Sequence, residues 1–173
     1  MCSMDTFKID LERLGEGVTT LEFGIDDRFF EAIDAPDVRR GELQVRLDID
    51  KNVVGYEFRF HTAGVVYIPC DLCLDDMAQT IETENRLLVK LGEAYSDNDD
   101  IVIVDENEGI LDTSWFIYEF IALAIPIKHV HAPGKCNPAM SKMLAEHSTA
   151  RSSEEEETKA VDPRWEKLKN LKI

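Results

Sequence analysis

The chain has 173 residues, a length that suits one folded domain with an appendage and permits a hydrophobic core without a disulfide scaffold. Its 35 acidic residues against 19 basic ones give a formal net charge of −16, which repels phosphates. This balance disfavours direct nucleic-acid binding and favours a basic protein partner, although acidity also serves solubility alone. The sequence has no apolar run of membrane-spanning length and no signal-peptide pattern, so we expect a cytoplasmic protein.

The first part of the chain predicts two short strands followed by a helix. Apolar runs around residues 7–11 and 18–25 are typical of strands. Between Asp26 and Ala35, acidic residues precede apolar residues at helical spacing, and Pro36 ends the pattern.

The middle of the chain predicts an antiparallel sheet. Polar and apolar residues alternate strictly over residues 43–49 and again over 56–61, with a turn-like stretch between them. Residues 79–91 alternate as well, and their apolar side comprises Ile81, Thr83, Asn85, Leu87, Val89 and Leu91. We therefore expect an α+β fold built on an antiparallel meander or partial barrel, with Cys70 and Cys73 at a tip between two strands.

Helical patterns dominate the later part. After one short strand and a turn within residues 101–110, the spacing predicts a helix over residues 112–125 that covers one face of the sheet. Asp112 or Thr113 is expected to cap it, Pro126 to end it, and its apolar residues are Trp115, Phe116, Phe120, Ile121, Leu123 and Ile125. Asn137 followed by Pro138 predicts the start of a further helix with an apolar stripe of Met140, Met143 and Leu144.

Composition divides the chain into three parts. Residues 1–146 form the predicted α+β domain, and residues 147–161, almost free of apolar side chains, predict a disordered acidic linker. Residues 162–173 predict a short C-terminal helix, which needs a surface to dock on because so short a helix is marginal in water. That surface belongs either to its own domain or to a partner, and in the second case Arg164, Trp165 and Leu168 are the predicted partner-binding residues.

The cysteine pair in "CDLCL" has three interpretations, of which a redox dithiol is the weakest. A redox site usually lowers the pKa of a thiol by placing it at a helix N-terminus. Here a strand pattern follows instead, and Asp71, Asp75 and Asp76 are expected to raise the pKa of the thiols.

A zinc site is the second interpretation. Cys70 and Cys73 have the spacing of half a site, and Cys136 with His131 supplies the other half, with His129 as the alternative imidazole. Cys136 also directly precedes a predicted helix, whose amide groups favour a thiolate. The third interpretation is that both cysteines only fill buried space and that the histidines are solvated in a loop.

No motif in the chain points to catalysis. The sequence has no nucleophile motif, no glycine-rich phosphate loop and no H-E-x-x-H, and its carboxylates are too numerous for one acid–base pair to stand out. We therefore expect a protein that is not an enzyme.

Four segments together resemble the YceD family, in the form found in Bacteroidetes: "CDLCL", "FIALAIP", "KHVHAPGKCNP" and "DPRWEKLKNL". The resemblance covers about residues 40–173 and implies a role in large ribosomal subunit biogenesis and 23S rRNA accumulation. The family's gene often lies beside that of a small large-subunit ribosomal protein, which suggests a basic ribosomal protein as partner. Many members carry a further cysteine near residues 137–140, and its absence here leaves His131 as the substitute ligand.

Two alternatives stay open at this stage. Direct rRNA binding would use a local basic surface, for example Arg39, Arg40, Arg46 and Arg59 with Tyr56 and Phe58 nearby, or the lysine-rich predicted C-terminal helix. The arginines could instead balance neighbouring carboxylates. The chain could also be a zinc-stabilised interaction module with an unrelated role.

Overall fold

A computed structural model describes residues 4–93, 96–98 and 101–147 of the protein. The chain divides into two units, Met1–Asn137 and Pro138–Ile173. The described part of the first unit contains a 3-10 helix and ten other elements: η1 (Met4–Phe7), β1 (Lys8–Asp10), β2 (Gly17–Ile25), α1 (Asp27–Ala32), β3 (Arg40–Asn52), β4 (Gly55–Pro69), β5 (Asp76–Gly92), β6 (Ser96–Asn98), β7 (Ile101–Asp105), β8 (Ile110–Asp112) and α2 (Ser114–Leu123). The described part of the second unit contains α3 (Pro138–His147).

The main sheet confirms the predicted α+β fold and its antiparallel meander. Its six strands follow the order β2-β3-β4-β5-β7-β6, and β2 to β5 are neighbours in both sequence and space. The sheet stays open rather than closing into a barrel, with β2 and β6 as its edges. β7 lies parallel to β5 and pairs only with its last residues, while β1 and β8 form a separate two-stranded sheet.

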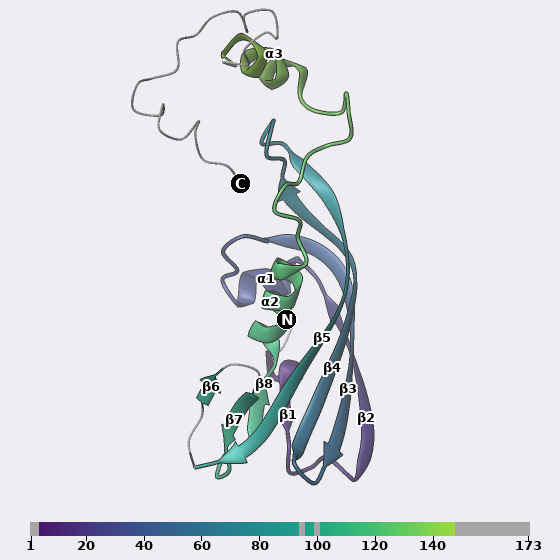
Figure 1. Ribbon diagram of the computed structural model, residues 1–173, viewed down its shortest axis with the longest axis vertical. Helices are drawn as coiled ribbons and strands as arrows, with labels where there is room; N and C mark the ends of the chain where they lie inside the picture. Colours follow the sequence, from purple (N-terminus) through teal and green to yellow (C-terminus); the bar gives the residue numbers. More distant parts are fainter. Residues whose placement is uncertain (1–3, 94–95, 99–100, 148–173) are drawn as a thin grey trace, which may run out of the picture. The chain divides into compact units, whose positions relative to one another are not determined.

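One face of the long strands carries the core. Alternate residues of β3 are buried, as the sequence predicts, and Phe58 and Phe60 of β4 are at most 1% exposed. The rings of Phe60 and Phe120 lie 5.2 Å apart, so α2 covers this face as expected. Figure 1 shows α1, α2, β1 and β8 on the same side of β2–β5. The opposite face is polar because strand residues alternate between the two faces.

The helix ends follow the predicted chemistry with one difference. The side chain of Asp26 accepts hydrogen bonds from the backbone N–H groups of Arg28 and Phe29, which fixes the start of α1. The Asp112 carboxylate, one of the two predicted caps, accepts from the backbone N–H of Ser114 at 2.9 Å at the start of α2. The Thr113 hydroxyl, the other, instead donates to the carbonyl of Phe7 at 2.8 Å. This bond ties α2 to the N-terminal segment.

Three side chains predicted to face the core are exposed. Trp115 and Leu123 of α2 are 47% and 80% exposed, because the helix is apolar on more sides than the sheet can cover. Leu91, near the end of β5, is also exposed. Sequence spacing identified the long strands and α2 but overestimated how much of α2 and β5 is buried, and it did not predict the short strands β6 and β8.

The structure leaves several predictions about the C-terminal part untested. α3 starts at Pro138 as predicted, and none of its residues is buried, including Met143 and Leu144. The remaining linker and the predicted C-terminal helix, with Arg164, Trp165 and Leu168, lie outside the described residues. The boundary predicted after residue 146 stays a prediction.

Candidate metal centre

The cysteine pair lies at the predicted tip, in the tight turn between β4 and β5. The backbone N–H of Cys70 donates to the carbonyl of Asp75 at 2.9 Å, and the N–H of Leu74 donates back to the carbonyl of Cys70 at 2.9 Å. Leu74 takes a left-handed backbone conformation (φ 61°), where glycine is usual. These bonds fold the turn so that Cys70 and Cys73 are both buried, at 0% and 2% exposure.

A second segment, residues 126–137, lies against this turn and brings the other half of the site. The backbone N–H of Asp71 donates to the carbonyl of His129 at 3.0 Å, and the N–H of His129 donates to the Asp71 carboxylate at 2.8 Å. The side-chain amide of Asn137 donates to the Asp75 carboxylate at 3.2 Å. Two aspartates of the turn thus hold the segment on either side of His131 and Cys136.

Cys70, Cys73, His131 and Cys136 converge, with one ligand atom from each lying within 4.8 Å of the others. The Sγ atoms of Cys70 and Cys136 are 3.9 Å apart, and the Sγ of Cys73 is 3.4 Å from Nδ1 of His131. A tetrahedral zinc ion about 2.3 Å from each sulfur would hold two sulfurs about 3.8 Å apart. Three thiols and one imidazole at this spacing fit a structural zinc site of the Cys₃His type.

His129, the alternative ligand in the sequence prediction, is engaged elsewhere. Its Nε2 lies 3.3 Å from the Asp71 carboxylate, and its Nδ1 lies 3.0 Å from the carbonyl of Pro126. Both ring nitrogens therefore face oxygen partners, and this histidine fixes the path of the segment that carries His131.

The protonation of the thiols differs from the sequence expectation. Burial alone would raise the pKa of Cys70, but hydrogen bonds from the backbone N–H groups of Cys73, His131 and Leu72, and from the His131 ring, lower it to about 6. The expected rise of the thiol pKa is therefore wrong for Cys70, because hydrogen bonds from the turn and from His131 outweigh burial. The pKa of Cys136 is raised to about 11 by burial and by its hydrogen bonds to Cys70 and Cys73. The predicted effect of the following helix on this thiol stays a prediction.

The four arginine positions proposed for rRNA contact do not form a free basic surface. Arg40 pairs with Asp76, Arg46 lies 3.1 Å from Asp48, and Arg59 lies 3.7 Å from Glu57. The pKa of Asp48 is held below its usual value, mainly by the hydroxyl of Thr20 and further by Arg46, which keeps this carboxylate ionised. Arg39, the fourth, is exposed beside acidic residues of α1 and its following turn.

The aromatic residues assigned to the same rRNA surface are not available there. Tyr56 and Phe58 are 7% and 0% exposed, on the core side of β4. Alternate residues of a strand face opposite sides of the sheet, so Tyr56 and Phe58 lie on the face opposite Arg59. The expectation that they join the arginines in one RNA-binding surface is therefore wrong.

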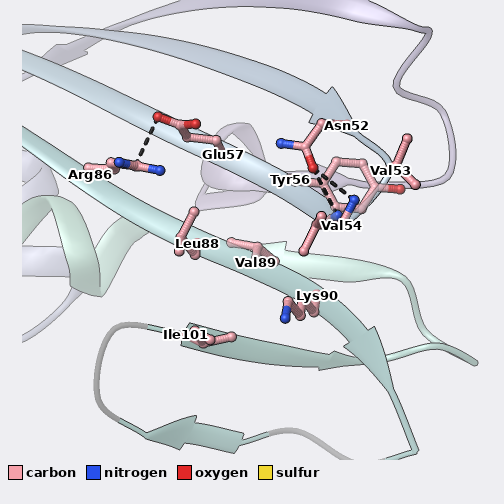
Figure 2. A pocket seen from close by; sticks show the side chains of 11 residues that line it. Asn52, Val53, Val54, Tyr56, Glu57, Arg86, Leu88, Val89, Lys90 and Ile101 are labelled. Atoms are coloured by element: carbon pink, nitrogen blue, oxygen red, sulfur yellow. Dashed lines mark hydrogen bonds and ion pairs between the residues drawn. The ribbon is translucent and has the colours of Figure 1, made fainter.

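A separate hollow of about 460 Å³ lies at the far end of the sheet, beside the turn between β3 and β4. Figure 2 shows Val54, Leu88 and Ile101 around it, with the Arg86–Glu57 ion pair at 2.9 Å on one side. Its lining is mainly apolar and holds no set of convergent polar groups, so it offers neither a metal ligand set nor a catalytic arrangement.

Sequence reasoning found the four converging residues but missed the groups that position them. Asp71 and Asp75 entered the sequence argument only as negative charges near the thiols. Their position beside the cysteines of a tight turn was the available sign, because a short acidic side chain there commonly accepts backbone hydrogen bonds.

The fold and the site define an α+β protein with an open, mostly antiparallel sheet and a Cys₃His cluster at one end. No helix in the described part of the chain has the length and apolar character to cross a membrane. A family model described as "Large ribosomal RNA subunit accumulation protein YceD" matches residues 58–172. The chain belongs to this family, which supports a role in accumulation of the large-subunit ribosomal RNA. No curated protein and no solved structure gave a match.

Proposed function

We propose that this protein supports 23S rRNA accumulation as a non-enzymatic factor of large-subunit biogenesis in the cytoplasm, by contacting a basic ribosomal protein. The family match over residues 58–172 carries the link to the ribosomal RNA. The net charge of −16 favours a basic protein over RNA as the direct partner, since phosphates and carboxylates repel each other.

The polar face of the sheet supports the choice of a protein partner. Arg46, Arg59 and Arg86 lie on this face, and each has a carboxylate within ion-pair distance. RNA binding would require these arginines to exchange carboxylates for phosphates, with the same carboxylates left facing the RNA. A cationic protein would instead be attracted to exposed carboxylates on this face that pair with no arginine among the described residues, such as Glu82.

The metal centre has a structural part in this proposal. A zinc ion bound by Cys70, Cys73, His131 and Cys136 would supply a cross-link between the β4–β5 turn and the segment after α2. The fourfold ligand set leaves no open position for a substrate or water, which argues for a structural rather than a catalytic metal.

The partner is tested with the tagged full-length chain and total protein extracted from large ribosomal subunits. We expect one or a few basic ribosomal proteins to be retained at low salt and released as salt rises, because screening weakens attraction between opposite charges. Retention of rRNA fragments without protein, or of proteins that salt does not release, would contradict the proposed partner.

The cellular role is tested separately by deleting the gene in its host. We expect the ratio of 23S to 16S rRNA to fall and the wild-type gene to restore it. An unchanged ratio in the deletion strain would overturn the proposed role, whatever the chain binds in vitro.

A further inference from the structure

β5 carries a long backbone edge that lacks a strand partner. On one side, β5 pairs with β4 along its length, from Asp76 opposite Pro69 to Val89 opposite Tyr56. On the other side, β7 pairs only with residues 88–92. Within the described residues, no strand and no other backbone group hydrogen-bonds to residues 77–87 on that side. Alternate residues of this stretch therefore direct N–H and C=O groups away from β4.

This edge lacks the sequence devices that usually prevent strand addition. Proteins protect free edges with lysine, proline or bulges, or cover them with a helix or loop. The helix α2 packs near β5, but its backbone makes no hydrogen bond to residues 77–87, all of which the structure describes. Residues 77–87 contain no lysine and no proline, and the pairing with β4 runs without a bulge. The one cation there, Arg86, lies 2.9 Å from Glu57 of β4, so its charge is drawn across the sheet and away from the edge (Figure 2).

The side chains beside the edge favour a cationic partner. Glu82 and Glu84 are exposed and lie two residues apart, so both project from the polar face of the sheet. The Glu84 carboxylate lies 3.3 Å from the His61 ring of β4, whereas no such contact holds Glu82 within the described residues. A strand added beside them would place alternate side chains next to these carboxylates, where opposite charges stabilise and like charges destabilise the pair. A second copy of this chain would bring glutamates against glutamates.

The existing sheet shows where an added strand would end. Leu88 of β5 lies opposite Ile101 of β7, so the row beside β5 is already occupied from that point onward (Figure 2). The vacant stretch is in line with β7 and accommodates an extended segment of about ten residues, given the rise of a strand per residue.

We propose that residues 77–87 of β5 bind an extended segment of a basic protein as an added strand, with lysine or arginine at every second position facing Glu82 and Glu84. The inference rests on the proposed function and adds the way in which its basic partner binds. Backbone hydrogen bonds supply the attachment, and the two carboxylates select the charge.

The other free edge of the sheet provides the contrast. β2 pairs with β3 along its whole length and exposes Val18 and Glu22 on the same polar face. Glu22 is the one carboxylate that β2 contributes to this face. The hydroxyl of Thr20, two residues before it, donates to the Asp48 carboxylate at 2.5 Å. Changes on β2 therefore serve as a matched control for changes on β5.

The test uses the full-length chain and a fluorescein-labelled ten-residue peptide of alternating lysine and valine, at physiological ionic strength. A twin peptide carries N-methyl groups on alternate amides, which removes one edge of backbone donors and keeps the charge. We expect the unmodified peptide to bind at least tenfold more tightly than the twin and to slow hydrogen exchange over residues 77–87. Equal binding of the two peptides would overturn the proposal.

Two double variants locate the site. E82K/E84K is expected to weaken peptide binding at least tenfold, whereas V18K/E22K, with a comparable change in net charge on the β2 edge, is expected to bind like wild type. Both are checked for an unchanged melting temperature. Equal loss in both variants, no loss in E82K/E84K, or a wild-type chain that dimerises through residues 77–87 would each contradict the proposal.

The same variants separate this inference from the proposed function. If E82K/E84K still retains the basic ribosomal proteins that wild type retains, the β5 edge is not the binding site, although the function stands. If wild type binds the peptide but retains no ribosomal protein, the partner class is wrong, although the edge binds strands.

Discussion

The core part of the β4–β5 pair and its cysteine turn are held together by different means. In the core part, Phe58 and Phe60 of β4 are buried on the face that α2 covers. At the cysteine turn, Leu72 and Leu74 are 45% and 68% exposed, and the contacts of the turn are chiefly hydrogen bonds and clustered thiols. The sheet therefore draws its stability from apolar burial. The turn depends on hydrogen bonds and on the four clustered side chains of the candidate zinc site.

The largest expected effect comes from breaking the apolar region. Phe58→Ala removes a ring that is 0% exposed and leaves a cavity, so we expect a loss of about 3–5 kcal/mol in the free energy of unfolding. Arg59→Ala, at the exposed neighbouring position, is the control and is expected to cost less than about 1 kcal/mol. Urea denaturation measures both, and similar losses in the two variants would remove the distinction between the faces.

A medium effect is expected from loosening the turn without touching a ligand. Asp71→Ala removes the carboxylate that accepts from His129, so we expect zinc affinity to fall about 10- to 100-fold. Asp76→Ala is the control, because Asp76 lies nearby but pairs with Arg40. Competition with a chromogenic chelator measures both affinities. An undiminished affinity in Asp71→Ala, or an equal loss in Asp76→Ala, would show that Asp71 does not position the site.

The smallest expected effect on stability also concerns the apolar region. The buried hydroxyl of Thr62 has no hydrogen-bond partner in the described part of the chain. Thr62→Val keeps the shape and removes the desolvated hydroxyl, so we expect a gain of about 1 kcal/mol in the free energy of unfolding. Thermal denaturation measures the change, and a loss of stability would indicate that the hydroxyl is hydrogen-bonded in solution.

The sequence was most informative where local pattern decides structure. Alternation predicted β3 to β5 and the tip that carries Cys70 and Cys73, because a half-buried strand must alternate. It did not predict the pairing of Ile9 with Leu111 or the parallel contact of β7 with β5, since such pairings depend on distant segments.

The candidate site shows the same limit. Residue chemistry and spacing nominated Cys70, Cys73, Cys136 and two histidines, but could not choose between His129 and His131. The choice is made by the Asp71 carboxylate and the Pro126 carbonyl, which lie 3.3 Å and 3.0 Å from the two ring nitrogens of His129. His131 is left to face Cys73. Long-range contacts of this kind carry no local pattern.

The most direct test of the central claim combines zinc analysis with hydrogen exchange on the full-length chain. We expect one zinc per chain in wild type and none in Cys70→Ser. Removing the metal with a chelator should speed exchange in residues 70–76 and 127–136, while β3 and the core part of β4 stay protected. A wild-type chain that binds no zinc even when it is supplied, or chelation that unfolds both regions together, would contradict the account.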